Sequence, residues 1–325
     1  MISRRRLTGC LVLSPIAVFA QGSDPNWRPQ RPITFVVPFS AGSGTDMLAR
    51  IMAPSVAAEL GVNVVVENRG GAGGTLATAA VVRGRPDGYT LVVSGTSTVP
   101  INRTLYPNLG FDPHRDLAPV GVAVTTPNAL VVRADSPFRS VEDLIAALRD
   151  PARPTRHWST GNGTSQHLSG VQLLRAVGGN AEHIPYRGPS EGVAGLLAGD
   201  TEWGFSALPA IAGLARDGRI RILGITGTQQ DPSLPNTPTL ASRGLSTFSE
   251  TDVWIGLAVP RPAPPEVIAT LRAAFSRAQP AMAARLTSAG FTPAAAMDPV
   301  ELELFVDKQV SFWEQLVTQA GARIE

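Results

Sequence analysis

Cysteine is almost absent from this chain, and other kinds of catalytic residue lack their usual patterns. Cys10 is the one cysteine in 325 residues, so after removal of a leader neither a disulfide nor a thiol nucleophile is available. The four histidines have none of the short paired spacings of a zinc site. No Gly-Lys-Ser/Thr sequence is present for a nucleotide P-loop. We therefore predict a protein that needs no metal or cofactor and is not an enzyme.

The first twenty residues have the pattern of an export signal. Three arginines at 4–6 precede an apolar run, 11–20, that is too short to span a membrane and ends in a small-residue cleavage pattern. We predict a signal peptide at residues 1–20, exported by the general or the twin-arginine route, and a mature protein in the periplasm. Those arginines are three of 28 basic residues against 26 acidic ones, so the mature chain is close to neutral. Its charge gives no reason to expect binding to nucleic acid.

Short apolar runs alternate with amphipathic runs along most of the chain, which indicates an α/β fold with mainly parallel sheets flanked by helices. Strands are expected at residues 33–37, 62–67, 89–94, 130–133, 157–159, 183–186, 202–206 and 220–226, and at the apolar run 253–259. Helices are expected at residues 47–60, 75–83, 141–149, 167–177, 191–198, 209–216, 265–278, 281–289 and 299–319.

The tail after Val259 shows no strand pattern, so it cannot form an α/β domain by itself. We expect it to pack on the first half of the chain. This predicts one lobe at residues 27–125 plus 252–325 and a second lobe at residues 126–251. The chain would cross between the lobes near residues 125 and 251, and these two hinge crossings would border a cleft.

The most informative segment is Pro-Phe-Ser-Ala-Gly-Ser-Gly-Thr-Asp at residues 38–46, between the first strand and the first helix. A glycine-rich turn there leaves backbone N–H groups without intrahelical partners, and such groups favour an anion. Asp46 is expected to cap the helix. A tight turn that binds nothing is the alternative. A dinucleotide fingerprint is disfavoured, because Met47 stands at the third glycine position.

Three further turns have a similar composition: residues 69–75, 95–97 and 159–165. Arg69 would reach an acidic ligand, although an ion pair with Glu67 is the simpler expectation. His167, which follows the last of these turns, either faces a ligand or bonds the backbone, and we favour the backbone. Several anion-binding turns without a catalytic set suggest a protein that holds a small acid and does not transform it.

Six segments, in this order, resemble the periplasmic receptors of tripartite tricarboxylate transporters (TctC type), often called Bug proteins. They are residues 31–46, 64–74, 86–97, 159–170, 183–188 and 253–260, and the resemblance extends over about residues 27–325. It implies a two-lobed periplasmic-binding-protein-like fold, similar to type II, that closes on a small carboxylate held by backbone N–H groups and water. The implied partners are a small organic anion and the membrane permease subunits, and we expect a monomer.

The resemblance also implies which residues line the pocket. Carried over by position they are Phe39, Ser40, Ala41, Gly42, Ser43, Gly44, Thr45, Asp46, Thr96, Ser97, Ser159, Thr160, Gly161, Asn162, Gly163, Thr164 and Ser206, and the turn composition adds Gly73 and His167. Such receptors often carry an acid at the position of Ser206. A serine there weakens the expectation of an amino-acid ligand.

Two other functions stay open at this point. An exported enzyme acting on a small acid would show turnover of a bound compound. A sensory co-receptor would use the same cleft but a different membrane partner.

Overall fold

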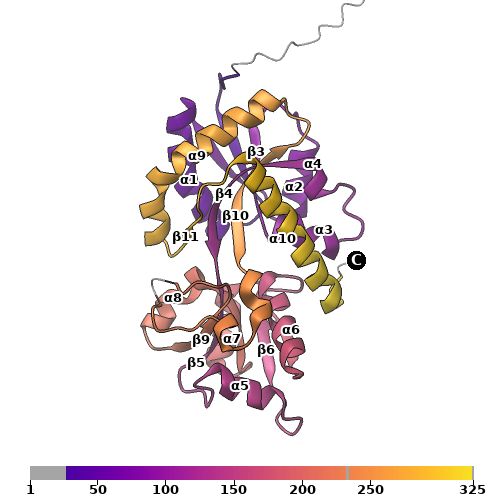
Figure 1. Cartoon of the computed structure of the whole chain (residues 1–325), viewed down its shortest axis with the longest axis vertical. Coiled ribbons are helices and arrows are strands. Elements are labelled where there is room, and N and C mark those ends of the chain that lie inside the picture. Colours follow the sequence, from indigo (N-terminus) through magenta and orange to yellow (C-terminus); the bar gives the residue numbers. More distant parts are fainter. Residues whose placement is uncertain (1–26, 232–233, 324–325) are drawn as a thin grey trace, which may run out of the picture.

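The structure is a computed structural model, and it describes residues 27–231 and 234–323. The predicted signal peptide lies outside the described residues. Two α/β lobes are stacked along the long axis of the molecule, and the chain connects them through neighbouring segments (Figure 1). Of the described residues, we call 27–126 plus 252–323 lobe 1 and 127–251 lobe 2.

Lobe 1 is built on a sheet that has the strand order β11-β4-β10-β3-β1-β2 in the described part of the chain. Its strands are β1 (Ile33–Val37), β2 (Val64–Asn68), β3 (Thr90–Gly95), β4 (Leu117–Thr126), β10 (Val253–Pro260) and β11 (Thr292–Pro293). Its helices are α1 (Gly44–Leu60), α2 (Thr75–Val82), α3 (Asn102–Leu105), α4 (Pro113–Asp116), α9 (Pro265–Ser288) and α10 (Pro299–Ala320), with short helical turns η1 (Ala72–Gly74) and η2 (Ser97–Ile101).

Lobe 2 has a smaller sheet with the strand order β7-β6-β8-β5-β9 among the described residues. Its strands are β5 (Asn128–Arg133), β6 (Arg156–Ser159), β7 (Glu182–Pro185), β8 (Trp203–Ala207) and β9 (Ile220–Ile225). Its helices are α5 (Val141–Leu148), α6 (Ser165–Val177), α7 (Pro189–Ala198) and α8 (Leu208–Arg216), with turns η3 (Ala241–Arg243) and η4 (Ser246–Glu250).

The two-lobed α/β fold with two hinge crossings is confirmed, but the sheets are mixed and not mainly parallel. In lobe 1 β1 is parallel to β2 and β3, and in lobe 2 β6 is parallel to β7 and β8. β10 is antiparallel to both β3 and β4, and β5 is antiparallel to β8 and β9. The physical reason is the double crossing: β4 runs toward lobe 2 and β10 returns beside it in the opposite direction.

Several elements differ from the sequence prediction. The tail after Val259 was expected to hold no strand, but β11 pairs with β4, because two residues are too few to show an apolar pattern in the sequence. β4 was not predicted, because Pro119 and Gly121 interrupt its apolar pattern. The structure accommodates both, since register irregularities occur along the β4–β10 pairing and an added Cβ at Gly121 would come within 2.2 Å of the Phe275 ring. The predicted helices 265–278 and 281–289 are one helix, α9, which continues through Pro280.

Helices cover both faces of the lobe 1 sheet. α1 and α9 pack with one set of strand side chains, including Phe35 and Leu257, and α2 and α10 pack with the opposite set, including Val36 and Trp254. α10 also reaches lobe 2, where Trp313 shares a buried cluster with Leu168. In the described part of the chain, no helix combines the length and apolar character that a bilayer crossing requires.

Candidate functional site

Two adjoining cavities occupy the cleft between the lobes. Cavity 1 has a volume of ≈ 580 Å³ and cavity 2 of ≈ 900 Å³. Both are lined by Ser40, Ser43 and Thr45 from lobe 1 and by Thr160 and Gln166 from lobe 2. Volumes of this size, with convergent polar groups from two sides, are typical of small-molecule sites.

Most of the predicted site residues line these cavities. They are Phe39, Ser40, Ala41, Gly42, Ser43, Gly44, Thr45, Gly73, Thr96, Ser97, Thr160, Gly161, Asn162, Thr164 and Ser206. The other four, Asp46, Ser159, Gly163 and His167, do not line either cavity and instead support the turns from behind.

The lobe 1 turn, residues 39–46, is held by a buried carboxylate. Asp46 is 4% exposed, and its Oδ2 accepts the Gly42 N–H at 2.9 Å. Its Oδ1 accepts from Asn68 Nδ2 at 3.0 Å, and the same amide donates to the Phe39 carbonyl at 3.1 Å. The helix cap is Ser43 and not Asp46, because α1 begins three residues earlier than predicted and the Ser43 hydroxyl accepts the Asp46 N–H. Asp46 therefore braces the turn that faces the cavity.

The ionisation of Asp46 depends on its partners. Burial by itself would raise the pKa of this carboxyl group, but hydrogen bonds from Arg50, Gly42 and Asn68 outweigh burial and lower the pKa. Arg50 lies 3.0 Å from Asp46 Oδ1 and is itself half exposed. The turn is thus organised around a carboxylate that stays charged at neutral pH.

The other lobe 1 turns are also held by internal bonds. Arg69 pairs with Glu67 through Nε–Oε1 at 2.7 Å, which confirms the structural ion pair that the sequence favoured. The Gly73 carbonyl accepts from Asn102 Nδ2 at 2.9 Å. Thr96 Oγ1 accepts the Trp254 N–H at 2.9 Å, so this hydroxyl also ties the β3 turn to β10.

The lobe 2 turn, residues 159–165, is held by neutral groups. Ser159 Oγ accepts the Gly161 N–H at 3.1 Å and lies 2.8 Å from His183 Nε2. His167 Nδ1 accepts the Gly163 N–H at 3.0 Å, which confirms the expectation that this histidine bonds the backbone. Gly163 has φ = +74°, and a Cβ there would lie 2.2 Å from Leu105 Cδ2 of lobe 1. This turn therefore requires a glycine where it meets lobe 1.

Behind this turn three histidine rings stack on a tryptophan. The ring centroids of Trp203 and His157, His157 and His183, and His183 and His167 lie 4.7, 4.8 and 4.1 Å apart. Burial, reinforced by the neighbouring histidines, lowers the pKa of His157 to about 3 and that of His183 to about 4. Burial also lowers the pKa of His167. The stack is therefore uncharged at neutral pH.

Two buried hydroxyls on the wall of cavity 2 have no hydrogen-bond partner among the residues that the structure describes. Thr126 is 4% exposed and Ser206 is fully buried, and both Oγ atoms are unpartnered among the described residues. Buried polar groups are rarely left unpaired, because each one costs about 1–3 kcal/mol. Both oxygens are closed to solvent in this structure, so a ligand in cavity 2 would bond them only after this wall rearranges.

A line of hydrogen bonds connects the lobe 2 turn to the hinge. Thr160 Oγ1 donates to Gln166 Oε1 at 2.9 Å, and Gln166 Nε2 donates to Asn128 Oδ1 at 3.0 Å. The Asn128 N–H, at the first crossing, donates to Thr226 Oγ1, which donates to Asp252 at the second crossing, both at 2.9 Å. Burial raises the pKa of Asp252, and the Thr226 hydroxyl partly offsets this effect. These bonds link the lobe 2 turn to both crossings in one continuous line.

Sequence reasoning missed several cavity-lining residues, including Thr126, Gln166, Arg187 and Arg219. Arg187 lies in residues 183–188, one of the segments that carry the family resemblance. That position in the segment could have indicated that Arg187 lines the site. Residues 188–192 form a G-x-S-x-G sequence, and its serine, Ser190, lines cavity 2. No histidine or carboxylate is hydrogen-bonded to Ser190 within the described part of the chain, so it lacks the partners of a nucleophile elbow.

The site is better suited to binding than to proton transfer. Ser159 touches His183, but this serine is fully buried and its oxygen is bonded to the backbone of its own turn. The described residues contain no cluster of three or more histidine, cysteine or acidic side chains that could hold a metal ion. The groups that line the cavities are the backbone of the glycine turns, hydroxyl and amide side chains, and two arginines, Arg187 in cavity 1 and Arg219 in cavity 2, all of which can bind an anion.

Comparisons with known proteins agree with this geometry. Residues 48–322 match the model of the tripartite tricarboxylate transporter family receptor (TctC). Protein BugT of Bordetella pertussis is 30% identical over 302 residues, which cover 91% of each chain. MatC from Rhodopseudomonas palustris, solved with bound malate, has a TM-score of 0.76 at 30% identity and covers 89% of this chain and 99% of its own. Rpa4515 from R. palustris, solved with adipate, has a TM-score of 0.80 at 30% identity, with coverage of 90% and 98%.

The family model spans most of the chain, and the relatives match at about 30% identity over nearly their full length. Together these matches identify the family of this chain. The chain belongs to the TctC family of tripartite tricarboxylate transporter receptors, which includes the Bug proteins.

Proposed function

We propose that this protein is a periplasmic receptor that captures a small organic carboxylate between its lobes and delivers it to the permease subunits of a tripartite tricarboxylate-type transporter. The observation that carries the proposal is the pair of glycine turns, residues 39–46 and 159–165, that line the same cleft from opposite lobes. Solved relatives of about 30% identity that hold malate and adipate support a carboxylate ligand.

These donors suit such a receptor. A carboxylate that bridges the N–H and hydroxyl donors of both turns is stabilised when the cleft closes, and Arg187 and Arg219 on the cavity walls add positive charge that attracts it. Ligand contact with both turns would favour the closed arrangement, because each turn belongs to a different lobe. The closed lobes would then present one surface to a permease.

Cavity 2 suggests that the ligand also has a hydrocarbon part. Its wall includes Val193, Leu197, Leu214 and Phe291 beside the two unpartnered hydroxyls. We expect a dicarboxylate or hydroxy acid whose carbon chain lies on this apolar wall. Once this wall rearranges, a polar group of such a ligand would bond Thr126 and Ser206.

A ligand screen tests the proposal directly. Purified mature protein is titrated with adipate, malate, tricarboxylates, aromatic carboxylates and amino acids, and thermal unfolding and binding heat are measured. A ligand at a hundredfold excess over its Kd should stabilise the fold by about 2.7 kcal/mol. The absence of any shift with millimolar anions would contradict the proposal, and accumulation of a product from a bound acid would favour an enzyme instead.

A matched pair of variants tests the placement of the site. Ser206→Ala should weaken binding of the best acid about tenfold or more, because a hydrogen bond to a charged group is lost, without lowering the stability of the free protein. Thr201 is the control, since its hydroxyl is also buried and unpartnered but lies outside both cavities. Thr201→Val should leave the affinity unchanged. Equal effects of the two substitutions would remove Ser206 from the site.

A further inference from the structure

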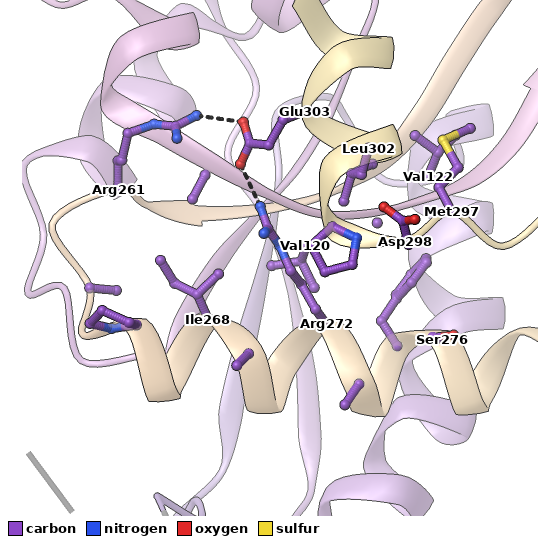
Figure 2. Close-up of a pocket in the computed structure, with 18 of the residues that line it drawn as sticks. Val120, Val122, Arg261, Ile268, Arg272, Ser276, Met297, Asp298, Leu302 and Glu303 are labelled. Carbon is purple, nitrogen blue, oxygen red and sulfur yellow. Dashed lines mark hydrogen bonds and ion pairs between the residues drawn. The ribbon is translucent and has the colours of Figure 1, made fainter. Parts of the chain in front are cut away.

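A third cavity of ≈ 640 Å³ lies in lobe 1, and none of its lining residues lines the cleft. Figure 2 shows it between α9, which carries Ile268 and Arg272, and the start of α10, which carries Leu302 and Glu303. The strand β4 contributes Val120 and Val122 to its floor. We call this cavity the α9–α10 groove.

The groove exists because one edge of the lobe 1 sheet is left open. β11 pairs with β4 only at Val124 and Thr125, so within residues 27–231 and 234–323 no strand neighbours residues 117–122 of β4 on that side. α9 and α10 cover opposite faces of the sheet and diverge at this edge. Ala269 and Ala273 of α9 line the groove with short, exposed side chains, which leaves its volume unfilled.

The open edge is not available to an added strand. The Leu117 carbonyl accepts from Arg261 Nε at 3.1 Å, and the Pro119 carbonyl accepts from Arg272 Nε at 2.9 Å. The Val122 carbonyl accepts from Gln279 Nε2 at 3.1 Å. An incoming strand would need these same acceptors. The groove therefore suits a small molecule better than a peptide strand.

One end of the groove carries more positive than negative charge. Glu303 accepts from Arg272 Nη2 at 2.5 Å and from Arg261 Nη2 at 3.2 Å, so one carboxylate serves two guanidinium groups (Figure 2). No hydrogen bond joins either Nη1 to another described residue. Arg272 is largely buried, with a side chain 18% exposed. Spare donors on a poorly solvated cation are well placed to bind an anion.

At the other end of the groove lies the Asp298 carboxylate, which already accepts hydrogen bonds within the protein. Asp298 Oδ1 accepts the Val300 and Glu301 N–H groups at 2.8 and 2.9 Å and so caps α10. Between the two ends the walls are mainly apolar, with Val120, Ile268 and Leu302 among them. The groove thus combines a cationic end with an apolar body.

We propose that the α9–α10 groove is a second ligand site, which takes an amphipathic monocarboxylate such as a medium-chain fatty acid. The carboxylate binds the free Nη1 groups of Arg261 and Arg272, and the hydrocarbon chain lies against Ile268, Ala269 and Ala273. This site is independent of the cleft and of the function proposed for the cleft.

Calorimetric titration of the mature protein with decanoate tests the site. We expect one mole bound per mole of protein, with affinity rising about three- to fourfold for each added methylene from hexanoate to decanoate. Decanol should bind at least tenfold more weakly than decanoate, because it cannot pair with the arginines. Arg261→Gln should reduce this preference for the acid over the alcohol.

Matched substitutions separate the groove from the cleft. Ala273 in the groove and Ala194 in cavity 2 are both exposed helical alanines. Ala273→Phe should weaken decanoate binding at least tenfold and leave adipate binding unchanged. Ala194→Phe should weaken adipate binding at least tenfold and leave decanoate binding unchanged. Decanoate binding that survives Ala273→Phe, or is lost with Ala194→Phe, overturns the groove proposal. A failure of adipate binding alone bears only on the cleft.

Discussion

The two turns that line the cleft have similar sequences but are held by different chemistry. In lobe 1 an ionised carboxylate, Asp46, accepts a backbone N–H of the turn and is balanced by Arg50. In lobe 2 the corresponding acceptors are the neutral Ser159 hydroxyl and the neutral His167 ring. A glycine-rich turn therefore does not determine how it is supported, because the support comes from residues outside it.

This difference predicts different responses to acid. The pKa of Asp46 is lowered, so the lobe 1 turn keeps its carboxylate down to strongly acidic pH. The lobe 2 turn packs against the buried histidine stack. The pKa values of these histidines are also lowered, so the imidazole rings are uncharged at neutral pH. Mild acid should therefore act on lobe 2 and leave the lobe 1 turn intact.

Removal of the lobe 1 carboxylate should have the largest effect. Asp46→Ala leaves the Gly42 N–H without its acceptor and the Asn68 amide with only the Phe39 carbonyl, which we expect to lower the free energy of unfolding by about 2–4 kcal/mol. It should also weaken ligand binding more than tenfold, because the turn loses its brace. Urea denaturation and calorimetry measure the two effects.

A second acidic residue provides the control. Asp143 accepts the Ser140 N–H in the capping box of α5, remote from the cleft. Asp143→Ala should lower stability less than Asp46→Ala does and leave the affinity unchanged. If both variants changed the affinity equally, Asp46 would have no special role in the turn.

Acid should destabilise the protein through the histidine stack. The pKa of His157 is about 3 in the folded state against an ordinary value of 6.5, so below pH 6.5 the unfolded chain binds the proton and the folded chain does not. Stability therefore falls as the pH drops from about 6.5 toward 3, and His157 contributes about 2–3 kcal/mol of this loss by pH 4.5.

The variant His157→Leu should remove that contribution. Its free energy of unfolding should change less between pH 7 and pH 4.5 than that of the wild-type protein, as measured by urea denaturation at each pH. An unchanged pH profile in the variant would show that the stack does not control acid stability.

The smallest effect is expected for the line of hydrogen bonds from the turn to the hinge. Gln166→Leu disconnects Thr160 from Asn128, and we expect about a three- to tenfold loss of affinity with little change in stability. Gln172 on the same helix is the control, because it bonds the Thr247 carbonyl at 2.7 Å, away from the cleft. Gln172→Leu should lower stability and leave affinity unchanged, and the reverse pattern would contradict a coupling role for Gln166.

Much of the fold and of the cleft could be predicted from local pattern. The alternation of apolar and amphipathic runs located most strands and helices, and the glycine turns located the cleft-facing loops. β4 was not predicted, because Pro119 and Gly121 are unusual in a strand. Only the structure shows the irregular pairing with β10 and the Phe275 ring, which together accommodate these two residues. Asp46 and His167 were included among the site residues, with a helix cap expected for Asp46 and a backbone bond favoured for His167; the structure shows that both accept backbone N–H groups of the turns, because sequence position does not reveal which way a side chain points.

The amino-acid sequence by itself determined the layered α/β class, the two crossings, the glycine turns and the family, since each depends on residues close together in the chain. Only the tertiary structure decided which residues support the turns, which hydroxyls are left unpaired and where the α9–α10 groove lies. Those features arise between segments distant in sequence, such as Asp46 with Asn68, Ser159 with His183 and Arg272 with Glu303. Distances and burial between such segments are set by packing and do not appear in any local pattern.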